Sequence, residues 1–203
     1  QMVQLKRGRR LVWAATAGIS MVLTMVTPSA YAAKQVTNDA RHDVAAISVD
    51  SLFGDYQITP APTEASSDIT RSVINHRRTR LVTKVHFRDA QPRKAPVLLL
   101  LITTPTDRYE AFYGKGQGVG GGPDFELTQG FSSDQITCKG VKLSFDLDTD
   151  VASISIPRRC LGSPRWVRMR IGSMGKEASG NFILIDDAHR EGMRRDLVLV
   201  NGS

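Results

Sequence analysis

Apolar and polar residues alternate one by one along much of the chain. In one stretch, Leu81, Val85 and Phe87 fall on one face of an extended backbone, and Lys84 and His86 fall on the other. A period of two residues is typical of a strand that is buried on one side. Short patterns of the same β type predict further strands over 69–75, 141–147, 151–156, 167–171, 182–185 and 197–200.

The run Val97–Thr104, with the sequence VLLLLITT, is almost entirely apolar and shorter than a typical helix. Such a run predicts a strand that is covered on both faces. In the sequence, no segment repeats its apolar residues with a period of 3.6 over three turns. About seven or eight short strands separated by turns predict an all-β fold, an antiparallel β-sandwich. The pattern leaves its topology, jelly-roll or immunoglobulin-like, open.

The first 33 residues have the order of a secretory signal peptide. A basic segment precedes an apolar run over 11–26, and Ala30-Tyr31-Ala32 forms a small-x-small cleavage site. The apolar run has about 16 residues, fewer than the roughly 20 that cross a bilayer. We therefore expect a cleaved signal peptide, a secreted protein, and no membrane association after cleavage.

The rest of the chain divides in two by composition. Residues 34–67 are polar and contain Pro60 and Pro62, which predicts an N-terminal tail or loop with one possible strand over 44–49. Residues 68–203 carry the remaining strand patterns and are expected to form the β-sandwich domain.

The net charge of +7 depends partly on the signal segment. Four of the 27 basic residues lie in 1–33, which has no acidic residue, so 23 basic and 20 acidic residues remain, a net charge of +3. A charge this small does not indicate nucleic-acid binding, which usually needs a strongly basic domain. We expect an extracellular polymer or protein as the partner, and no nucleic acid.

Cys138 and Cys160 are the two cysteines of the chain. An even number of cysteines in an exported protein predicts a disulfide. By closing the loop between them, this disulfide would stabilise the folded protein by about 3 kcal/mol. If the strands on either side of 148–150 form a hairpin, both cysteines lie at its open end. The alternative is a free, reactive Cys160 whose pKa is lowered by the neighbouring Arg158 and Arg159.

Two segments, DITRSVINHRRTRLVTKVHFRD and SISIPRRCLGSPRWVRMRI, resemble a group of uncharacterised secreted proteins of high-GC Gram-positive bacteria. The shared features are an Asp-Ile strand, a turn with a histidine, and an Ile-Pro-Arg-x-Cys-Leu-Gly-x-Pro run. The resemblance spans roughly residues 68–171. It implies a disulfide and a β-rich mature domain, and it brings no activity.

Trp166, Arg168 and Arg170 share one face of a predicted strand. An exposed aromatic ring beside arginines forms a stacking surface for sugar rings, bases or acidic groups, so these residues are candidate ligand contacts. The alternative is a tryptophan buried under a loop, with the arginines paired to acidic residues across the sheet.

Asp146, Asp148 and Asp150 stand at alternate positions in the segment FDLDTD. Calcium prefers several carboxylate oxygens that converge at a turn, so these residues are a candidate calcium site, with Asp186 and Asp187 as further ligands if their loop is adjacent. The alternative is a hairpin turn in which the aspartates accept hydrogen bonds from their own backbone.

The sequence has no convincing catalytic motif. The segment Gly114–Asp124 contains a G-x-G-x-x-G pattern, but no helix pattern follows it, which favours a hairpin loop over a phosphate site. Neither a G-x-S-x-G elbow nor an H-E-x-x-H motif is present. We expect a secreted, non-catalytic binding module for carbohydrate or cell-wall polymer. The alternatives are a hydrolase with a dispersed active site and an inhibitor that presents the Gly114–Asp124 loop.

Overall fold

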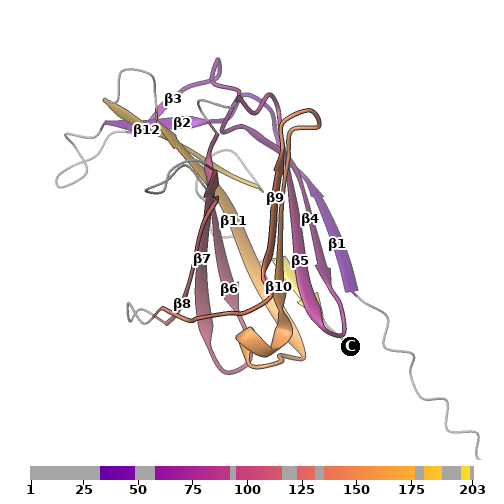
Figure 1. Ribbon diagram of the computed structural model, residues 1–203. Helices are drawn as coiled ribbons and strands as arrows, with labels where there is room; N and C mark the ends of the chain where they lie inside the picture. Colours follow the sequence, from indigo (N-terminus) through magenta and orange to yellow (C-terminus); the bar gives the residue numbers. More distant parts are fainter. Residues whose placement is uncertain are drawn as a thin grey trace, which may run out of the picture.

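Two antiparallel β-sheets face each other across an apolar core (Figure 1). The computed structural model describes residues 33–48, 58–91, 95–115, 123–130, 135–176, 181–188 and 198–201. The expected all-β sandwich with one disulfide is confirmed. The predicted signal segment lies outside the described residues, apart from Ala33, where the first strand begins.

The smaller sheet, sheet A, has five strands in the order β1-β4-β5-β10-β9. The larger sheet, sheet B, has the order β3-β2-β12-β11-β6-β7-β8, and β13 also pairs with β11. The strands of sheet A are β1 (Ala33–Asn38), β4 (Ile69–His76), β5 (Arg80–Phe87), β10 (Val151–Pro157) and β9 (Lys142–Asp146). Those of sheet B are β3 (Ile58–Pro60), β2 (Ala45–Ser48), β12 (Phe182–Asp187), β11 (Trp166–Lys176), β6 (Val97–Thr103), β7 (Arg108–Lys115), β8 (Pro123–Gln129) and β13 (Val198–Asn201).

The core lies between the inner faces of the two sheets. Its fully buried side chains alternate along the central strands, as a period of two residues requires. Sheet A contributes Leu81, Val85, Ala152, Ile154 and Ile156, and sheet B contributes Leu98, Leu100, Ile102, Val167 and Met169. The apolar alternation in the sequence thus selects which face of each strand turns inward.

Strand β6 is less covered than its sequence predicts. Leu98, Leu100 and Ile102 are buried on the inner face, but Leu99 and Leu101 on the outer face are only half-buried. The outer face is therefore covered only in part. The outer leucines lie beside side chains of the neighbouring strands, because Leu99 pairs with Phe112 of β7.

The segment 34–67 is more than a tail with one strand. The strand predicted over 44–49 is present as β2, but this segment also supplies most of β1, which pairs with β4, and all of β3, which pairs with β2. Strand β1 was missed because its inward positions are Ala33, Gln35 and Thr37 rather than large apolar residues. It is an edge strand of sheet A and pairs with one neighbour, β4.

The expected hairpin and its disulfide are confirmed. Strand β9 pairs with β10 through Asp146 and Val151, so residues 147–150 form the turn. At the open end, Cys138 and Cys160 form a disulfide with a Cα–Cα distance of 5.7 Å. A 3-10 turn (Arg158–Leu161) carries Cys160 and ends at Gly162, whose φ of 71° favours glycine. The reactive-thiol alternative for Cys160 is excluded in this structure.

The register of β11 makes a testable prediction. Val167→Ala should lower the free energy of unfolding by about 2 kcal/mol, because this side chain is fully buried and its removal leaves a cavity. Arg168→Ala should change it by no more than about 0.5 kcal/mol, because Arg168 is exposed. Urea denaturation of both variants measures the difference. The reverse ranking would show that β11 presents the opposite face to the core.

Candidate functional site

The outer face of sheet B brings together the predicted ligand residues. Trp166, Arg168 and Arg170 lie on the solvent side of β11, and the Arg168 guanidinium carbon stands 5.3 Å from the centre of the Trp166 ring. The alternative, a tryptophan ring buried under a loop, does not hold, since Trp166 is partly exposed. The arginines also do not face acidic residues directly across the sheet, because their β6 neighbours are Thr103 and Leu101.

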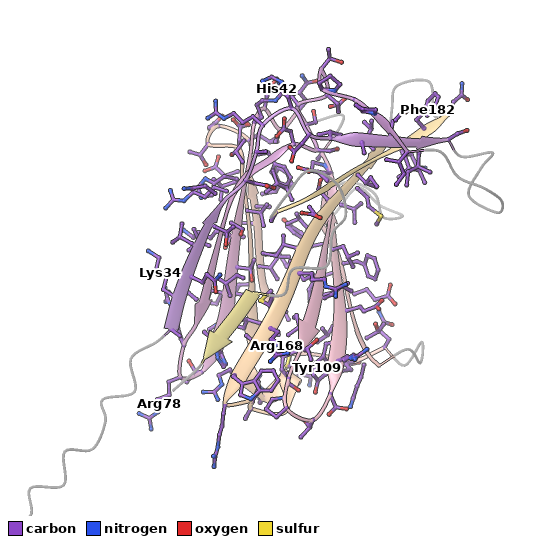
Figure 2. All side chains as sticks on the ribbon, turned by 180° about the vertical axis from the view of Figure 1, so that it is seen from behind. Lys34, His42, Arg78, Tyr109, Arg168 and Phe182 are labelled. Carbon is purple, nitrogen blue, oxygen red and sulfur yellow. A yellow bond between two sulfur atoms is a disulfide. The ribbon has the colours of Figure 1, made fainter. Side chains whose placement is uncertain are left out.

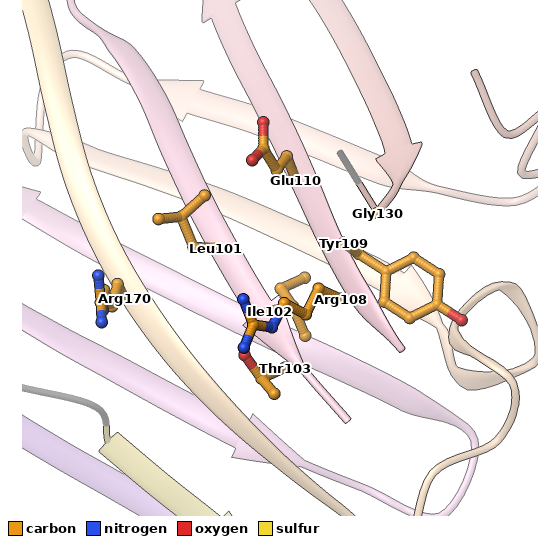
Figure 3. A pocket seen from close by; sticks show the side chains of 8 residues that line it. All are labelled: Leu101, Ile102, Thr103, Arg108, Tyr109, Glu110, Gly130 and Arg170. Atoms are coloured by element: carbon orange, nitrogen blue, oxygen red, sulfur yellow. The ribbon is translucent and has the colours of Figure 1, made fainter. Parts of the chain in front are cut away.

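A depression of about 240 Å³ lies on the same face beside Arg170 (Figure 3). It is open at the surface of three adjacent strands, β11, β6 and β7. Its lining residues are Leu101, Ile102, Thr103, Arg108, Tyr109, Glu110, Gly130 and Arg170. Sequence reasoning missed Arg108 and Glu110, although the alternation in RYEAFYGK was a usable signal for β7.

The charges on this face are mixed but mainly basic. Arg108 and Arg168 are exposed, Arg170 is half-buried, and Glu110 is the acidic residue that lines the depression. The Nε atom of Arg170 is buried and has no hydrogen-bond acceptor among the described residues. A ligand with acidic or hydroxyl oxygens would supply acceptors at this place.

The three aspartates of the predicted calcium site occupy the β9–β10 turn. The backbone N–H groups of Asp148 and Thr149 donate to Asp146 Oδ1, at 3.0 and 3.3 Å. Asp150 Oδ1 accepts a hydrogen bond from the Ala90 backbone at 2.9 Å. Two of these carboxylates therefore shape the turn and connect it to the residues after β5, which is the role expected of aspartates in turns. Calcium binding here stays a prediction.

A second group of carboxylates, here called the acidic centre, consists of Asp39, Asp43 and Asp186. Asp39 and Asp43 lie between β1 and β2, where the chain passes from sheet A to sheet B, and Asp186 lies near the end of β12. One oxygen of each carboxylate lies within 4.8 Å of one oxygen of the other two. Sequence reasoning missed this group as a site, because its members are far apart along the chain.

Residues at the start of β4 lie next to the acidic centre. Asp186 Oδ2 accepts a hydrogen bond from the Ile69 backbone at 2.6 Å. The adjacent Asp68 is fully buried, accepts a hydrogen bond from the His42 backbone at 2.8 Å, and forms an ion pair with Arg88 Nε at 2.8 Å. The Asp68 charge is thus largely balanced by Arg88.

Burial dominates the protonation of the acidic centre. It raises the pKa of Asp39 to about 8 and that of Asp186 to about 9. Backbone hydrogen bonds from Ala40 and Ile69 lower these pKa values in part, and the negative charges of Asp43 and Asp68 raise them. Negative charges close together in a poorly solvated place disfavour the ionised form of each carboxyl group, unless a positive charge is bound nearby.

The described histidines lie apart from one another. His42 is exposed beside the acidic centre, and its Nδ1 lies 2.9 Å from the Pro62 carbonyl oxygen. His76 is buried at the end of β4, and His86 lies on the outer face of β5.

The Gly114–Asp124 loop connects the paired ends of β7 and β8, Lys115 and Pro123, which confirms a hairpin connection. Residues 116–122 lie outside the described residues.

Comparison with known proteins adds no relative. No protein-family model, no curated protein and no solved structure matches this chain. Within the ranges that the structure describes, none of the helical segments has the length and apolar character that crossing a membrane requires.

Proposed function

We propose that this chain is an exported, non-catalytic binding module that holds an extracellular carbohydrate or cell-wall polymer on the outer face of sheet B. The observation that carries the proposal is the combination on one face of a half-exposed Trp166, the arginines Arg168 and Arg170, and an adjoining depression. Aromatic rings stack on flat, partly apolar ligand surfaces, and arginines donate to acidic or hydroxyl oxygens.

The shape of this face suits an extended ligand. The depression is open to solvent and is lined by residues of three adjacent strands, so a polymer can run over it without entering a closed pocket (Figure 3). The rows Arg168–Thr103–Arg108 and Arg170–Leu101–Glu110 place polar groups at regular strand spacing. The basic character of the face favours an acidic polymer over a neutral one.

A pull-down of the purified protein with insoluble polysaccharides and cell-wall material tests this proposal. Trp166→Ala should weaken retention about tenfold, because stacking on an aromatic ring is worth about 1–3 kcal/mol. The double variant Arg168→Ala/Arg170→Ala should also weaken it, and added salt should reduce retention of the wild type.

The matched control is Arg71→Ala, because Arg71 is an exposed arginine on β4 of sheet A. This variant should bind like the wild type. Equal losses in Arg71→Ala and in the Arg168→Ala/Arg170→Ala variant would show unspecific attraction. Failure to bind any tested polymer would count against this class of ligand.

A further inference from the structure

We propose that Asp39, Asp43 and Asp186 bind a calcium ion at the end of the sandwich where β1 passes into β2. This site is distinct from the β9–β10 turn and from the outer face of sheet B. Figure 2 shows His42, which neighbours Asp43 in the chain, and Arg168 at opposite ends of the molecule. The inference therefore does not rest on the proposed function.

In Asp186 and Asp39, one carboxylate oxygen accepts a backbone hydrogen bond and the other has no hydrogen-bond partner among the described residues. Asp186 is 4% exposed, and its Oδ2 accepts from the Ile69 backbone while its Oδ1 has no hydrogen-bond partner among the described residues. Asp39 repeats the pattern, since Oδ1 accepts from the Ala40 backbone at 2.9 Å and Oδ2 is buried without a partner in the described part of the chain. A buried acceptor without a donor is energetically unfavourable, unless a ligand is bound to it.

The same arrangement is that of metal-binding carboxylates. In metal sites one oxygen binds the ion, while the other is held by a hydrogen bond that orients the group. Here the backbone donors of Ala40 and Ile69 provide that orientation. The Asp186 carboxylate faces the cluster, since one of its oxygens lies within 4.8 Å of one oxygen each of Asp39 and Asp43.

The number of protein carboxylates favours calcium over magnesium. Calcium takes six to eight oxygen ligands at about 2.3–2.6 Å, so two of its ligands lie at most about 5 Å apart. Magnesium keeps several waters and is usually bound by only one or two carboxylates. The three carboxylates offer oxygens within 4.8 Å of one another, which fits calcium.

The charge that the site carries when its carboxylates are ionised suits a divalent cation. Three carboxylates carry up to three negative charges, and Asp68 beside them is already paired with Arg88. A divalent ion would balance most of this charge, which hydrogen bonds alone do not. A depression of about 370 Å³, lined by Arg41, His42, Asp43 and Val44 among others, opens next to the site and offers an entry path.

A bound ion would strengthen the connection between three parts of the fold. Asp39 and Asp43 belong to the crossover between the sheets, Asp186 belongs to β12 of sheet B, and Ile69 belongs to β4 of sheet A. The backbone N–H of Asp39 also donates to the Thr70 carbonyl at 3.1 Å. Calcium would thus hold the ends of both sheets together, and its removal would loosen this end first.

Calorimetric titration of the EDTA-treated, full-length protein with CaCl2 near neutral pH tests the inference. We expect a Kd of about 10⁻⁴ to 10⁻³ M, the range of extracellular calcium modules, and a higher melting temperature at about 5 mM CaCl2. Asp186→Asn should weaken binding at least about tenfold and remove the increase in melting temperature. If this variant does not fold, Asp39→Asn, at a partly exposed position, replaces it.

The matched control is Asp148→Asn, because Asp148 is an exposed aspartate in the β9–β10 turn. This variant should respond to calcium like the wild type. A wild type that gives no heat of binding and no change in melting temperature would overturn the inference. So would a response that is lost in Asp148→Asn and kept in Asp186→Asn and Asp39→Asn, and an equal response to MgCl2 would overturn the choice of calcium.

Discussion

Replacement of both Cys138 and Cys160 by alanine is expected to lower the free energy of unfolding by about 3 kcal/mol. The disulfide closes a loop with a sequence separation of 22 residues, and opening it increases the conformational entropy of the unfolded chain. The protein should still fold, because the rest of the core extends over both sheets and does not depend on this hairpin end. Equilibrium denaturation in guanidinium chloride measures the change.

Reduction provides the control for this experiment. With a thiol reductant present, the wild type should unfold at nearly the same denaturant concentration as the alanine variant, because both then lack the cross-link. The variant itself should not respond to reductant. Equal stability of the oxidised wild type and the variant would contradict the expected role of the bridge, and two titratable thiols in the denatured, non-reduced protein would contradict its formation.

Acidification is expected to destabilise the protein through His76 by about 3 kcal/mol. Burial, with a smaller contribution from the positive charge of Arg158, lowers the pKa of His76 from 6.5 to about 4. Between these two values the unfolded chain binds a proton that the folded chain does not, so stability falls as the pH drops from about 6.5 to about 4. Each pKa unit corresponds to about 1.4 kcal/mol, which sets the size of the effect.

The variant His76→Leu isolates this contribution. His76 is 1% exposed, and neither ring nitrogen has a hydrogen-bond partner among the described residues, so an apolar side chain suits the position. The difference in stability between wild type and variant should change by about 3 kcal/mol between neutral pH and pH of about 4, as measured by urea denaturation at each pH. His86→Leu is the control, with a smaller effect, because His86 is only half-buried. A difference that is independent of pH would show that His76 has the same pKa in the folded and the unfolded protein.

The strands that the sequence predicts are those whose apolar residues alternate. Arg80–Phe87 was predicted with the bounds that β5 has, and β4, β6 and β10 agree to within one residue, because inward positions there need large apolar side chains. Strands β7 and β8 were not predicted, and β11 extends five residues beyond its predicted end. Strand β1 has small or polar inward residues and was missed. An edge strand pairs with only one neighbouring strand through backbone hydrogen bonds, which do not require alternating apolar side chains in the sequence.

The pairing of Cys138 with Cys160 and the face of Trp166, Arg168 and Arg170 were also accessible from the sequence. Both depend on local geometry, a hairpin with a central turn and a strand with a period of two, in which positions along the chain translate directly into positions in space. The depression beside Arg170 was not accessible, because Arg108 and Glu110 join it only through the pairing of β7 with β6.

The acidic centre was decided by the tertiary structure alone. Asp39 and Asp43 stand in a polar segment that the sequence presents as a tail, and Asp186 lies near the end of β12, far along the chain. Their carboxylates converge because the chain crosses from sheet A to sheet B at the point where β12 ends and β4 begins. Periodicity and composition report which side of a strand is buried, but the order of strands within a sheet depends on long-range pairing, which leaves no local pattern in the sequence.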